Sequence, residues 1–270
     1  MSPTPPVALT IAGSDSGASA GVAADLKTFA SHGVHGVFAL TIATAQNTTG
    51  ITDVHELPAE FIGNQIDAVT RDFNVAATKT GLLYSPTAVD VVVERAHSLG
   101  PLVIDPVIVN SAGTPMLAPE MTLLYIDKLF PLAAVITPNV SEAGLLSGIE
   151  ISDRESASEA AKKLASFGPS VVVVTGLLEQ DAAVDVVSYD GSVEVVEHRR
   201  ILTSNVLGTG CSLSASITAS LASGLPVEGA IHAAVAFVLA GLESSATWRL
   251  GEGNGPIDHF AQSRSGMPGG

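Results

Sequence analysis

Short runs of β-branched and other apolar residues alternate with longer amphipathic stretches along most of the chain. This alternation is typical of parallel strands joined by crossover helices, and it predicts an α/β protein with a mostly parallel central sheet. The apolar runs predict strands at Val7–Ala12, Val37–Ala43, Ala76–Thr80, Leu102–Val107, Ala134–Thr137 and Val171–Thr175. The amphipathic stretches predict flanking helices at Ala20–His32, Ala59–Phe73, Thr87–Leu99, Glu120–Phe130 and Ser156–Phe167.

The last third of the chain follows a different pattern. Val184–Tyr189 and Val193–His198 alternate apolar and polar residues around Asp190-Gly191, which predicts a β-hairpin at an antiparallel edge of the sheet. Helices are predicted at Ser212–Ala222 and Glu228–Ser244. We find no repeat or composition break, so we expect one domain over residues 1–270, with a disordered tail from about residue 262.

Two of the predicted helices carry capping sequences at their starts. Ser85 followed by Pro86 suits an N-cap and a first helical position. Ser152 and Glu155 have the spacing of a capping box. We therefore expect both side chains of each pair to define a helix start.

Charge and composition narrow the function classes. With 12 Lys and Arg against 27 Asp and Glu, the net charge is −15, which argues against nucleic acid or an anionic membrane as a partner. Only 14% of residues are charged and 46% are hydrophobic, which excludes intrinsic disorder. The single cysteine, Cys211, excludes an internal disulfide and an all-cysteine zinc site. The sequence lacks a secretory leader pattern and an uninterrupted apolar run of about 18 residues, so we predict a soluble, cytoplasmic protein.

Ligands of open parallel α/β sheets bind at the carboxyl ends of the strands, so the loops that leave those ends are the candidate site. These loops are Gly13–Gly21, Thr44–Gly50, Gly81-Leu82, Asp105–Gly113, Pro138–Glu142 and Gly176–Gln180. Scattered histidines add no metal site, since the closest pair, His32 and His35, straddles a predicted helix end at Gly33.

The first of these loops, Gly13–Gly21, is rich in glycine and serine. Its glycines allow close approach of a ligand to the backbone, and Ser14 and Asp15 offer short polar contacts. The loop matches neither a Walker motif nor a dinucleotide fingerprint. Residues 17–21 formally match a serine hydrolase elbow around Ser19, although Gly13–Ser16 separates that serine from the strand. A glycine-rich connection without a ligand is the other interpretation.

A second glycine-rich turn, Asn205–Ser212, comes directly before a predicted helix. Backbone N–H groups of Gly208, Thr209 and Gly210 would point at an anion there, and the helix dipole would favour its charge. We predict a phosphate site. At this helix N-terminus Cys211 would have a lowered pKa and could act as a nucleophile or proton acceptor, unless it is a small buried thiol that packs under the turn.

Carboxylates follow two strands that we expect to be neighbours. Asp105 lies at the end of one strand, and Asn139 and Glu142 follow the next. Mg²⁺ prefers one or two carboxylates together with water and substrate phosphates. In combination with the turn at Gly208–Gly210, these residues predict a magnesium-dependent phosphate chemistry.

The motifs of the chain together resemble a known family. They are similar to those of the ribokinase-like small-molecule kinases, and within them of the hydroxymethylpyrimidine phosphate kinases of thiamine biosynthesis. The resemblance covers nearly the whole chain, in family order. The matching segments are AGSDSGASAGVAADLKTF (Ala12–Phe29), TAQNT (Thr44–Thr48), KTG (Lys79–Gly81), IDPV (Ile104–Val107), TPNVSEA (Thr137–Ala143), GTGCSLSASI (Gly208–Ile217) and GPIDHF (Gly255–Phe260).

This resemblance implies a three-layer fold, ATP and Mg²⁺ as cofactors, a homodimer and a role for particular residues. Gln46 would hydrogen-bond an aminopyrimidine, in a pocket also lined by Gly13, Asp25, Leu82 and Val107. Glu142, Asp105 and Asn139 would organise Mg²⁺ and the nucleotide, and Thr175 and Gly176 would form a nucleotide-side loop. Gly208, Thr209 and Gly210 would form an anion hole, with Cys211 where the substrate hydroxymethyl group is deprotonated or positioned.

The family phosphorylates the pyrimidine alcohol and then its monophosphate. The chain departs from the family pattern at three places. Asn110–Gly113 has no lysine, Thr175–Leu178 stands where a lysine-glycine-glycine-histidine run is common, and Leu207 replaces a histidine. The second phosphorylation must bind an anionic substrate, so the loss of these polar side chains affects the second phosphorylation more than the first. A pyridoxal kinase and a non-catalytic pyrimidine-binding homologue are the alternatives.

Overall fold

The computed structural model of the chain describes residues 4–109 and 115–264. Its centre is an eight-stranded sheet in the order β10-β9-β8-β7-β6-β5-β1-β2. The strands from β2 to β8 run parallel, and β8, β9 and β10 pair antiparallel, as predicted. Their bounds are β1 (Val7–Ala12), β2 (His35–Leu40), β5 (Val75–Thr80), β6 (Leu102–Ile104), β7 (Val135–Ile136), β8 (Val171–Leu178), β9 (Ala182–Tyr189) and β10 (Ser192–Arg199).

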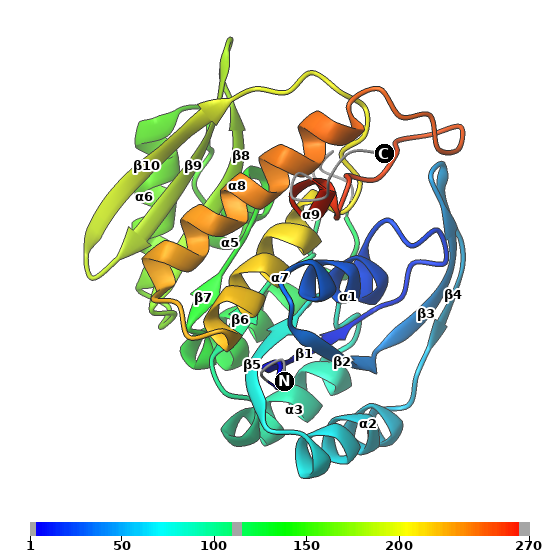
Figure 1. Cartoon of the computed structure of the whole chain (residues 1–270). Coiled ribbons are helices and arrows are strands. Elements are labelled where there is room, and N and C mark those ends of the chain that lie inside the picture. Colours follow the sequence, from blue (N-terminus) through cyan, green and yellow to red (C-terminus); the bar gives the residue numbers. More distant parts are fainter. Residues whose placement is uncertain (1–3, 110–114, 265–270) are drawn as a thin grey trace.

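Helices cover both faces of this sheet (Figure 1), which confirms the predicted three layers. One layer holds α2 (Ala59–Asp72), α3 (Pro86–Arg95), α4 (Met121–Leu124), α5 (Val140–Ser147) and α6 (Arg154–Ala165). The other holds α1 (Gly21–Ser31), α7 (Thr209–Ala222) and α8 (Val227–Ser245). Side chains alternate between the layers along each strand, since Leu102 and Ile104 join the first core and Val103 joins the second.

A second, two-stranded sheet of β3 (Ile42–Asn47) and β4 (Gly50–Glu56) projects beside β2 (Figure 1). The prediction of a strand at Val37–Ala43 followed by a loop at Thr44–Gly50 was therefore wrong. Thr41 ends β2, because its backbone N–H donates to Ala12 and its hydroxyl donates to the Leu82 carbonyl. The chain then leaves the main sheet, and every residue of β4 is exposed, so no apolar alternation marks it.

Two helical segments differ from the prediction. The segment predicted as one helix at Glu120–Phe130 is broken into α4, a π-helical turn at Tyr125–Leu129 and a 3₁₀ turn at Phe130–Leu132. Pro131 has no N–H for a continued α-helix. Helix α5 was missed, since Pro138–Glu142 was interpreted as a loop. The short helix α9 (Ala261–Arg264) extends into the tail predicted to be disordered from residue 262; residues 265–270 lie outside the described part.

The helix caps agree with the sequence at one place and not at the other. Ser85 accepts a hydrogen bond from the Ala88 N–H at 3.4 Å, with Pro86 at the first helical position, as predicted. At α6, however, the capping box uses Asp153 and Ser156. The predicted pair, Ser152 and Glu155, is wrong by one residue, because an aspartate is a strong N-cap and the Ser156 hydroxyl accepts from the Asp153 N–H.

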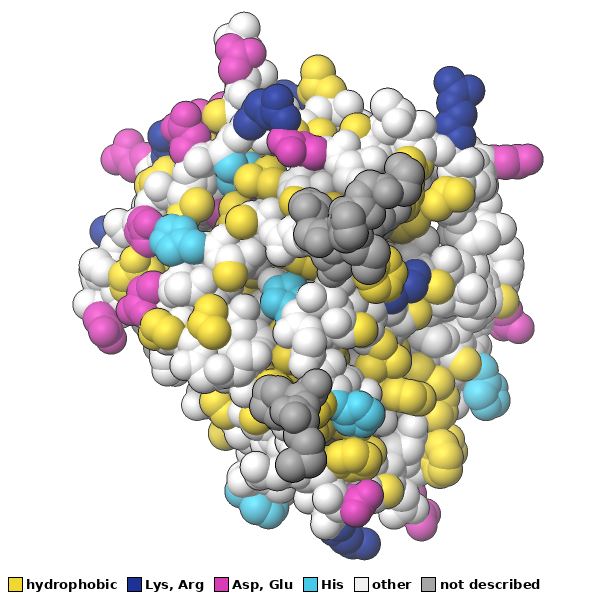
Figure 2. All heavy atoms as spheres, viewed as in Figure 1, with side chains coloured by type: hydrophobic (Ala, Val, Ile, Leu, Met, Phe, Trp, Pro, Cys, Tyr) yellow, Lys and Arg dark blue, Asp and Glu magenta, His cyan; other side chains and the backbone are white. Residues whose placement is uncertain are grey.

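Helix α8 is, within the described chain, the one helix long and apolar enough by length and composition to span a membrane. A core helix has the same properties. Ala230, Ile231, Ala234 and Val235 pack it against the sheet beside α7. On the face that carries α7 and α8, charged side chains lie mainly at the margins (Figure 2).

Candidate active site

The N-terminus of α7 lies against the glycine-rich loop that follows β1. The helix begins at Thr209, three residues earlier than predicted, with Gly208 as N-cap at φ 80°. A Cβ on Gly208 would overlap the Ser19 carbonyl oxygen, so only glycine fits this approach. No described residue accepts a hydrogen bond from the N–H groups of Gly210 and Cys211, which leaves them available to an anion.

The loop itself is held by the carboxylate of Asp15. It accepts hydrogen bonds from the N–H groups of Gly17, Ser19 and Ala20 at 2.8, 2.9 and 2.9 Å. Asp15 therefore shapes the loop, where the sequence had suggested a ligand contact. Ser19 is buried, and the chain between the end of β1 and α1 is too long for a nucleophile elbow, so the geometry does not support a hydrolase.

A buried charge cluster lies behind the start of α7. Lys79 of β5 is fully buried, and its Nζ lies 2.6 Å from Asp25 Oδ1 and 3.9 Å from Asp105 Oδ2. Burial lowers the pKa of Lys79, but the adjacent charges of Asp25 and Asp105 offset this, so its pKa is raised overall. Burial raises the pKa of Asp25 and of Asp105, although Lys79 favours the charged form of each.

Cys211 belongs to the same cluster, and its thiol and the Asp105 carboxyl group influence each other's pKa. Burial raises the pKa of the thiol to about 12; Lys79 opposes this, and the carboxylates of Asp105 and Asp25 add to it. The predicted lowering of this pKa was wrong. The helix N-terminus is present, but desolvation by burial outweighs it and the carboxylates of Asp105 and Asp25 add to the effect, so the thiol stays protonated at neutral pH.

This protonation state has a direct chemical readout. We expect iodoacetamide at pH 8 to alkylate Cys211 of the native protein at least about a hundredfold more slowly than in guanidinium-unfolded protein, because only the thiolate reacts. Mass spectrometry of timed samples measures both rates. Equal rates in the two states would show that the folded protein does not hold the thiol protonated.

Asp105 and Glu142 come together where β6 and the adjacent β7 end, as predicted. Glu142 and Asn139 form the capping box of α5, and Glu142 Oε1 also accepts from the Ile108 N–H at 2.8 Å. Burial, followed by the charge of Asp105, raises the pKa of Glu142 to about 8. The bond to Ile108 holds the preceding Val107 at φ 47°, a strained value for a β-branched residue.

The predicted pyrimidine-side residues lie at the same edge of the sheet. Gln46 is on β3 and is tied to Ser16 of the glycine-rich loop. A Cβ on Gly13 would lie 2.8 Å from the Ile42 side chain, so this glycine lets β3 approach. Leu82 and Val107 follow β5 and β6. Asp25 differs, because it is fully buried and paired with Lys79. The segment 110–113, which lacks the family lysine, lies outside the described residues.

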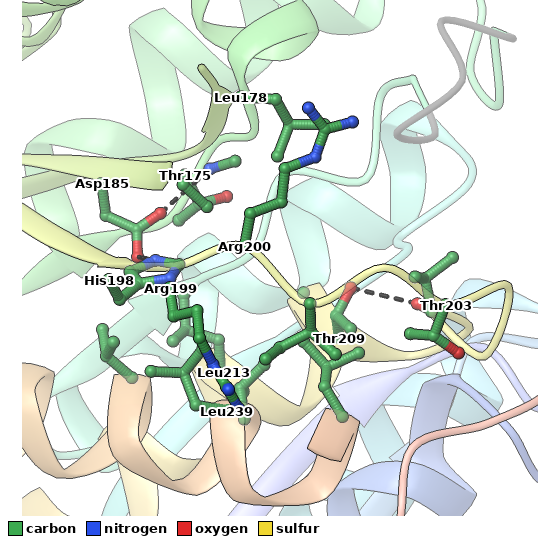
Figure 3. Close-up of a pocket in the computed structure, with 18 of the residues that line it drawn as sticks. Thr175, Leu178, Asp185, His198, Arg199, Arg200, Thr203, Thr209, Leu213 and Leu239 are labelled. Carbon is green, nitrogen blue, oxygen red and sulfur yellow. Dashed lines mark hydrogen bonds and ion pairs between the residues drawn. The ribbon is translucent and has the colours of Figure 1, made fainter. Parts of the chain in front are cut away.

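A cavity of about 420 Å³ opens between the antiparallel strands and α7 and α8. Thr175 and Gly176 line it, and so do Thr209 and Gly210 at the start of α7. Both Thr175 and Gly176 lie within β8, so the loop predicted from Gly176 was wrong, because β8 continues to Leu178 by pairing with β9. Figure 3 shows Thr175 on one side and the apolar Leu213 and Leu239 on the other. The cavity therefore joins an apolar floor to the N–H group of Gly210, which is unpaired within the described residues.

Sequence reasoning missed two polar residues of this cavity. Asp185 accepts a hydrogen bond from the Gly176 N–H at 2.9 Å and lies 3.1 Å from His198 Nε2 (Figure 3). The bond to Asp185 raises the pKa of His198. Both belong to the hairpin that was interpreted as a sheet edge only. A buried aspartate in an otherwise apolar strand was the available signal.

A second cavity, of about 450 Å³, is lined by Lys27, Trp248, Leu250 and residues 256–260. His259, from the predicted GPIDHF motif, is buried with Nε2 3.0 Å from the Ser212 hydroxyl. Burial lowers its pKa to about 4, so it is neutral at physiological pH. The hydrogen bond between His259 and Ser212 holds the C-terminal segment against the first turn of α7.

Comparison with known proteins decides the family. The family profile described as phosphomethylpyrimidine kinase matches residues 15–258. The chain belongs to this phosphomethylpyrimidine kinase family. It is 41% identical over 263 residues to the hydroxymethylpyrimidine/phosphomethylpyrimidine kinase of Haemophilus influenzae, covering 95% of this chain and 97% of that protein.

Solved structures agree with this family assignment. An ADP complex of Bacillus subtilis pyridoxal kinase is 38% identical with a TM-score of 0.87, covering 96% of this chain and 99% of that one. The phosphomethylpyrimidine kinase of Clostridium difficile is 34% identical with a TM-score of 0.77, covering 86% and 97%. The chain is accordingly a small-molecule kinase with a ribokinase-like fold.

Proposed function

We propose that this chain transfers the γ-phosphoryl group of ATP to the hydroxymethyl group of 4-amino-5-hydroxymethyl-2-methylpyrimidine. It then phosphorylates the monophosphate to the diphosphate used in thiamine biosynthesis. One observation carries the proposal: the cavity beside β8 to β10 reaches Thr209 and Gly210 at the N-terminus of α7, directly before Cys211 of the carboxylate and thiol cluster. The family membership supports the substrate class.

Catalysis would consist mainly of positioning and charge stabilisation. The nucleotide would occupy the cavity with its phosphates toward α7, where the N–H groups of Gly208 and Gly210 would stabilise the transferring group. The Thr209 N–H, predicted to join them, donates to the Val206 carbonyl instead. The substrate alcohol would lie at Cys211. Because this thiol is protonated, it would position the alcohol, whose proton would pass to the nearby Asp105 carboxylate.

The carboxylates fit a divalent cation. Asp105 and Glu142 are both buried, and each raises the other's free energy of ionisation, while only Lys79 lies near as a cation among the described residues. Glu142 Oε2 accepts one backbone N–H, from Asn139, and keeps a lone pair for a metal, whereas Oε1 accepts from both Ile108 and Val109. Both side chains would hold Mg²⁺ together with phosphate oxygens, and the ion would neutralise charge on the phosphates. Asn139 would support this site through Glu142.

Gln46 provides a test of the substrate side. We expect Gln46→Leu to raise KM for the pyrimidine by about tenfold or more, because a buried heterocycle edge would lose hydrogen-bond partners worth roughly 1–3 kcal/mol. KM for ATP should stay unchanged, since Gln46 lies outside the lining of the nucleotide cavity. Steady-state kinetics with each substrate varied in turn measure both constants. An unchanged pyrimidine KM would remove Gln46 from the substrate site.

The decisive experiment is an ADP-release assay with Mg-ATP on the pyrimidine alcohol, its monophosphate and pyridoxal. Turnover of both pyrimidines is expected. Pyridoxal turnover alone would support the second candidate, which the similarity to the Bacillus subtilis pyridoxal kinase favours. Tight binding without turnover would mark a non-catalytic homologue. A homodimer and a cytoplasmic location are part of this proposal and rest on the family resemblance.

A further inference from the structure

Hydroxyl groups attach β3 to the glycine-rich loop. The Ser16 hydroxyl donates to the Gln46 carbonyl at 2.8 Å and accepts from the Gln46 N–H at 2.7 Å. The Ser14 hydroxyl accepts from the Thr44 N–H at 3.0 Å. These contacts fix the backbone of Gln46, so the remaining freedom of this residue lies in its side chain.

The Thr44 hydroxyl fixes that side chain. This hydroxyl lies 2.9 Å from the Ser14 carbonyl oxygen and 3.1 Å from the end of the Gln46 amide, at the atom assigned as Oε1. Thr44 is 8% exposed, so water does not readily replace either contact. Gln46 makes no other side-chain hydrogen bond within the described residues.

The proton count at Thr44 decides which end of the amide faces it. A hydroxyl carries one proton, and a carbonyl oxygen can only accept. The proton therefore goes to Ser14, at the shorter distance, and the amide end that faces Thr44 has to be a donor. The two ends of a glutamine amide have the same shape, so their partners assign them. Turning the amide by 180° satisfies both contacts and places its NH₂ toward Thr44.

We propose that Thr44 is a positioning residue that sets the sense of the Gln46 amide, so that its carbonyl oxygen faces the substrate. This inference rests on the proposed function, in which Gln46 contacts the heterocycle. A carbonyl accepts from the amino group that the pyrimidine carries beside its hydroxymethyl group. Pyridoxal carries an aldehyde at that position, whose oxygen also only accepts. The network at Thr44 thus selects the aminopyrimidine over pyridoxal.

The first arm of the test removes the hydroxyl. Thr44→Val keeps the shape and β-propensity of the residue, and we expect it to raise KM for the pyrimidine about tenfold while kcat stays within about twofold. Thr44→Ser keeps the hydroxyl, so we expect it to keep the wild-type KM for the pyrimidine. Thr52→Val is the matched control, because the Thr52 hydroxyl on the neighbouring strand also donates to a carbonyl, that of Ala45, and is exposed. KM for pyridoxal should rise by less than about twofold.

The second arm tests the sense of the amide. Gln46→Glu keeps an oxygen that faces the substrate and can accept a hydrogen bond. We therefore expect a lower KM for the pyrimidine in Gln46→Glu than in the isosteric Gln46→Met. A KM for Gln46→Glu that equals or exceeds that of Gln46→Met would overturn the proposal. So would an unchanged KM in Thr44→Val, or an equal rise for pyrimidine and pyridoxal.

Two checks distinguish a failure of this proposal from misfolding of a variant and from a failure of the proposed function. Thermal unfolding of each variant shows whether it is folded. If Thr44→Val does not fold, the KM values of Thr44→Ser and of the two Gln46 variants still test the proposed role of Thr44. Wild-type turnover of the pyrimidine tests the proposed function independently. If wild type is inactive, that function fails, and calorimetric titration of the same variants with the pyrimidine decides the role of Thr44 by the same ranking.

Discussion

Gly208→Ala is expected to lower kcat by at least about a hundredfold, by analogy with the loss of an oxyanion-hole donor. The new Cβ would overlap the Ser19 carbonyl oxygen, and φ 80° is strained for alanine. The start of α7 would have to move away from the glycine-rich loop, and its N–H groups would leave the transferring phosphoryl group. Steady-state kinetics with saturating ATP and pyrimidine measure the loss.

The matched control is at the other end of the same helix. Gly224 has nearly the same backbone, φ 83°, but a Cβ added there would meet no described atom within 4 Å. Gly224→Ala should therefore show only the backbone strain, about 1 kcal/mol of unfolding free energy, with kcat retained. Equal losses of kcat in the two variants would mean that strain alone, and not the position of the α7 N-terminus, causes the effect.

Lys79→Met is expected to lower the free energy of unfolding by about 3–5 kcal/mol, because it leaves buried carboxylates without their cation. Asp25 and Asp105 are both buried, and Lys79 is the cation that contacts them among the described residues. Chemical denaturation at pH 7 measures the change. Protonation of a carboxylate can relieve part of the loss, so the destabilisation should be smaller at pH 5.

Two further variants make this result specific. Lys79→Met combined with Asp25→Asn removes both charges, so we expect the double variant to be more stable than Lys79→Met alone. Lys128→Met breaks an exposed pair with Asp90 and should cost at most about 1 kcal/mol. Strictly additive losses in the double variant would contradict the assigned pairing.

The sequence predicts the layered core well because its periodicity is local. Leu102, Val103 and Ile104 alternate between two helical layers, and each of the parallel strands can be recognised from its own apolar run. The hairpin of β3 and β4 could not be predicted in this way. It has no core of its own, and hydroxyl contacts to Ser14 and Ser16 hold it in place.

The sequence predicts where the residues of the candidate site lie in the fold, but not the electrostatic environment of each side chain. The rule that loops at strand ends bind ligands placed Asp105 and Glu142 together. It could not supply the pKa of Cys211, which depends on Asp25 and Lys79, contributed by α1 and β5. Nor could it show that the hairpin strands β9 and β10 line the cavity proposed for the nucleotide, because that follows from their position beside α7 and α8.

The two sides of the site come from different halves of the chain. The residues that line the cavity proposed for the nucleotide all lie between Thr175 and Leu242, whereas those proposed for the pyrimidine lie between Gly13 and Val107, apart from Cys211. Mutations can therefore change one of these two groups of residues and leave the other unchanged. Mutations in the first half can change the vitamin precursor that is phosphorylated while the phosphate donor stays the same, which gives this architecture a route to new acceptors.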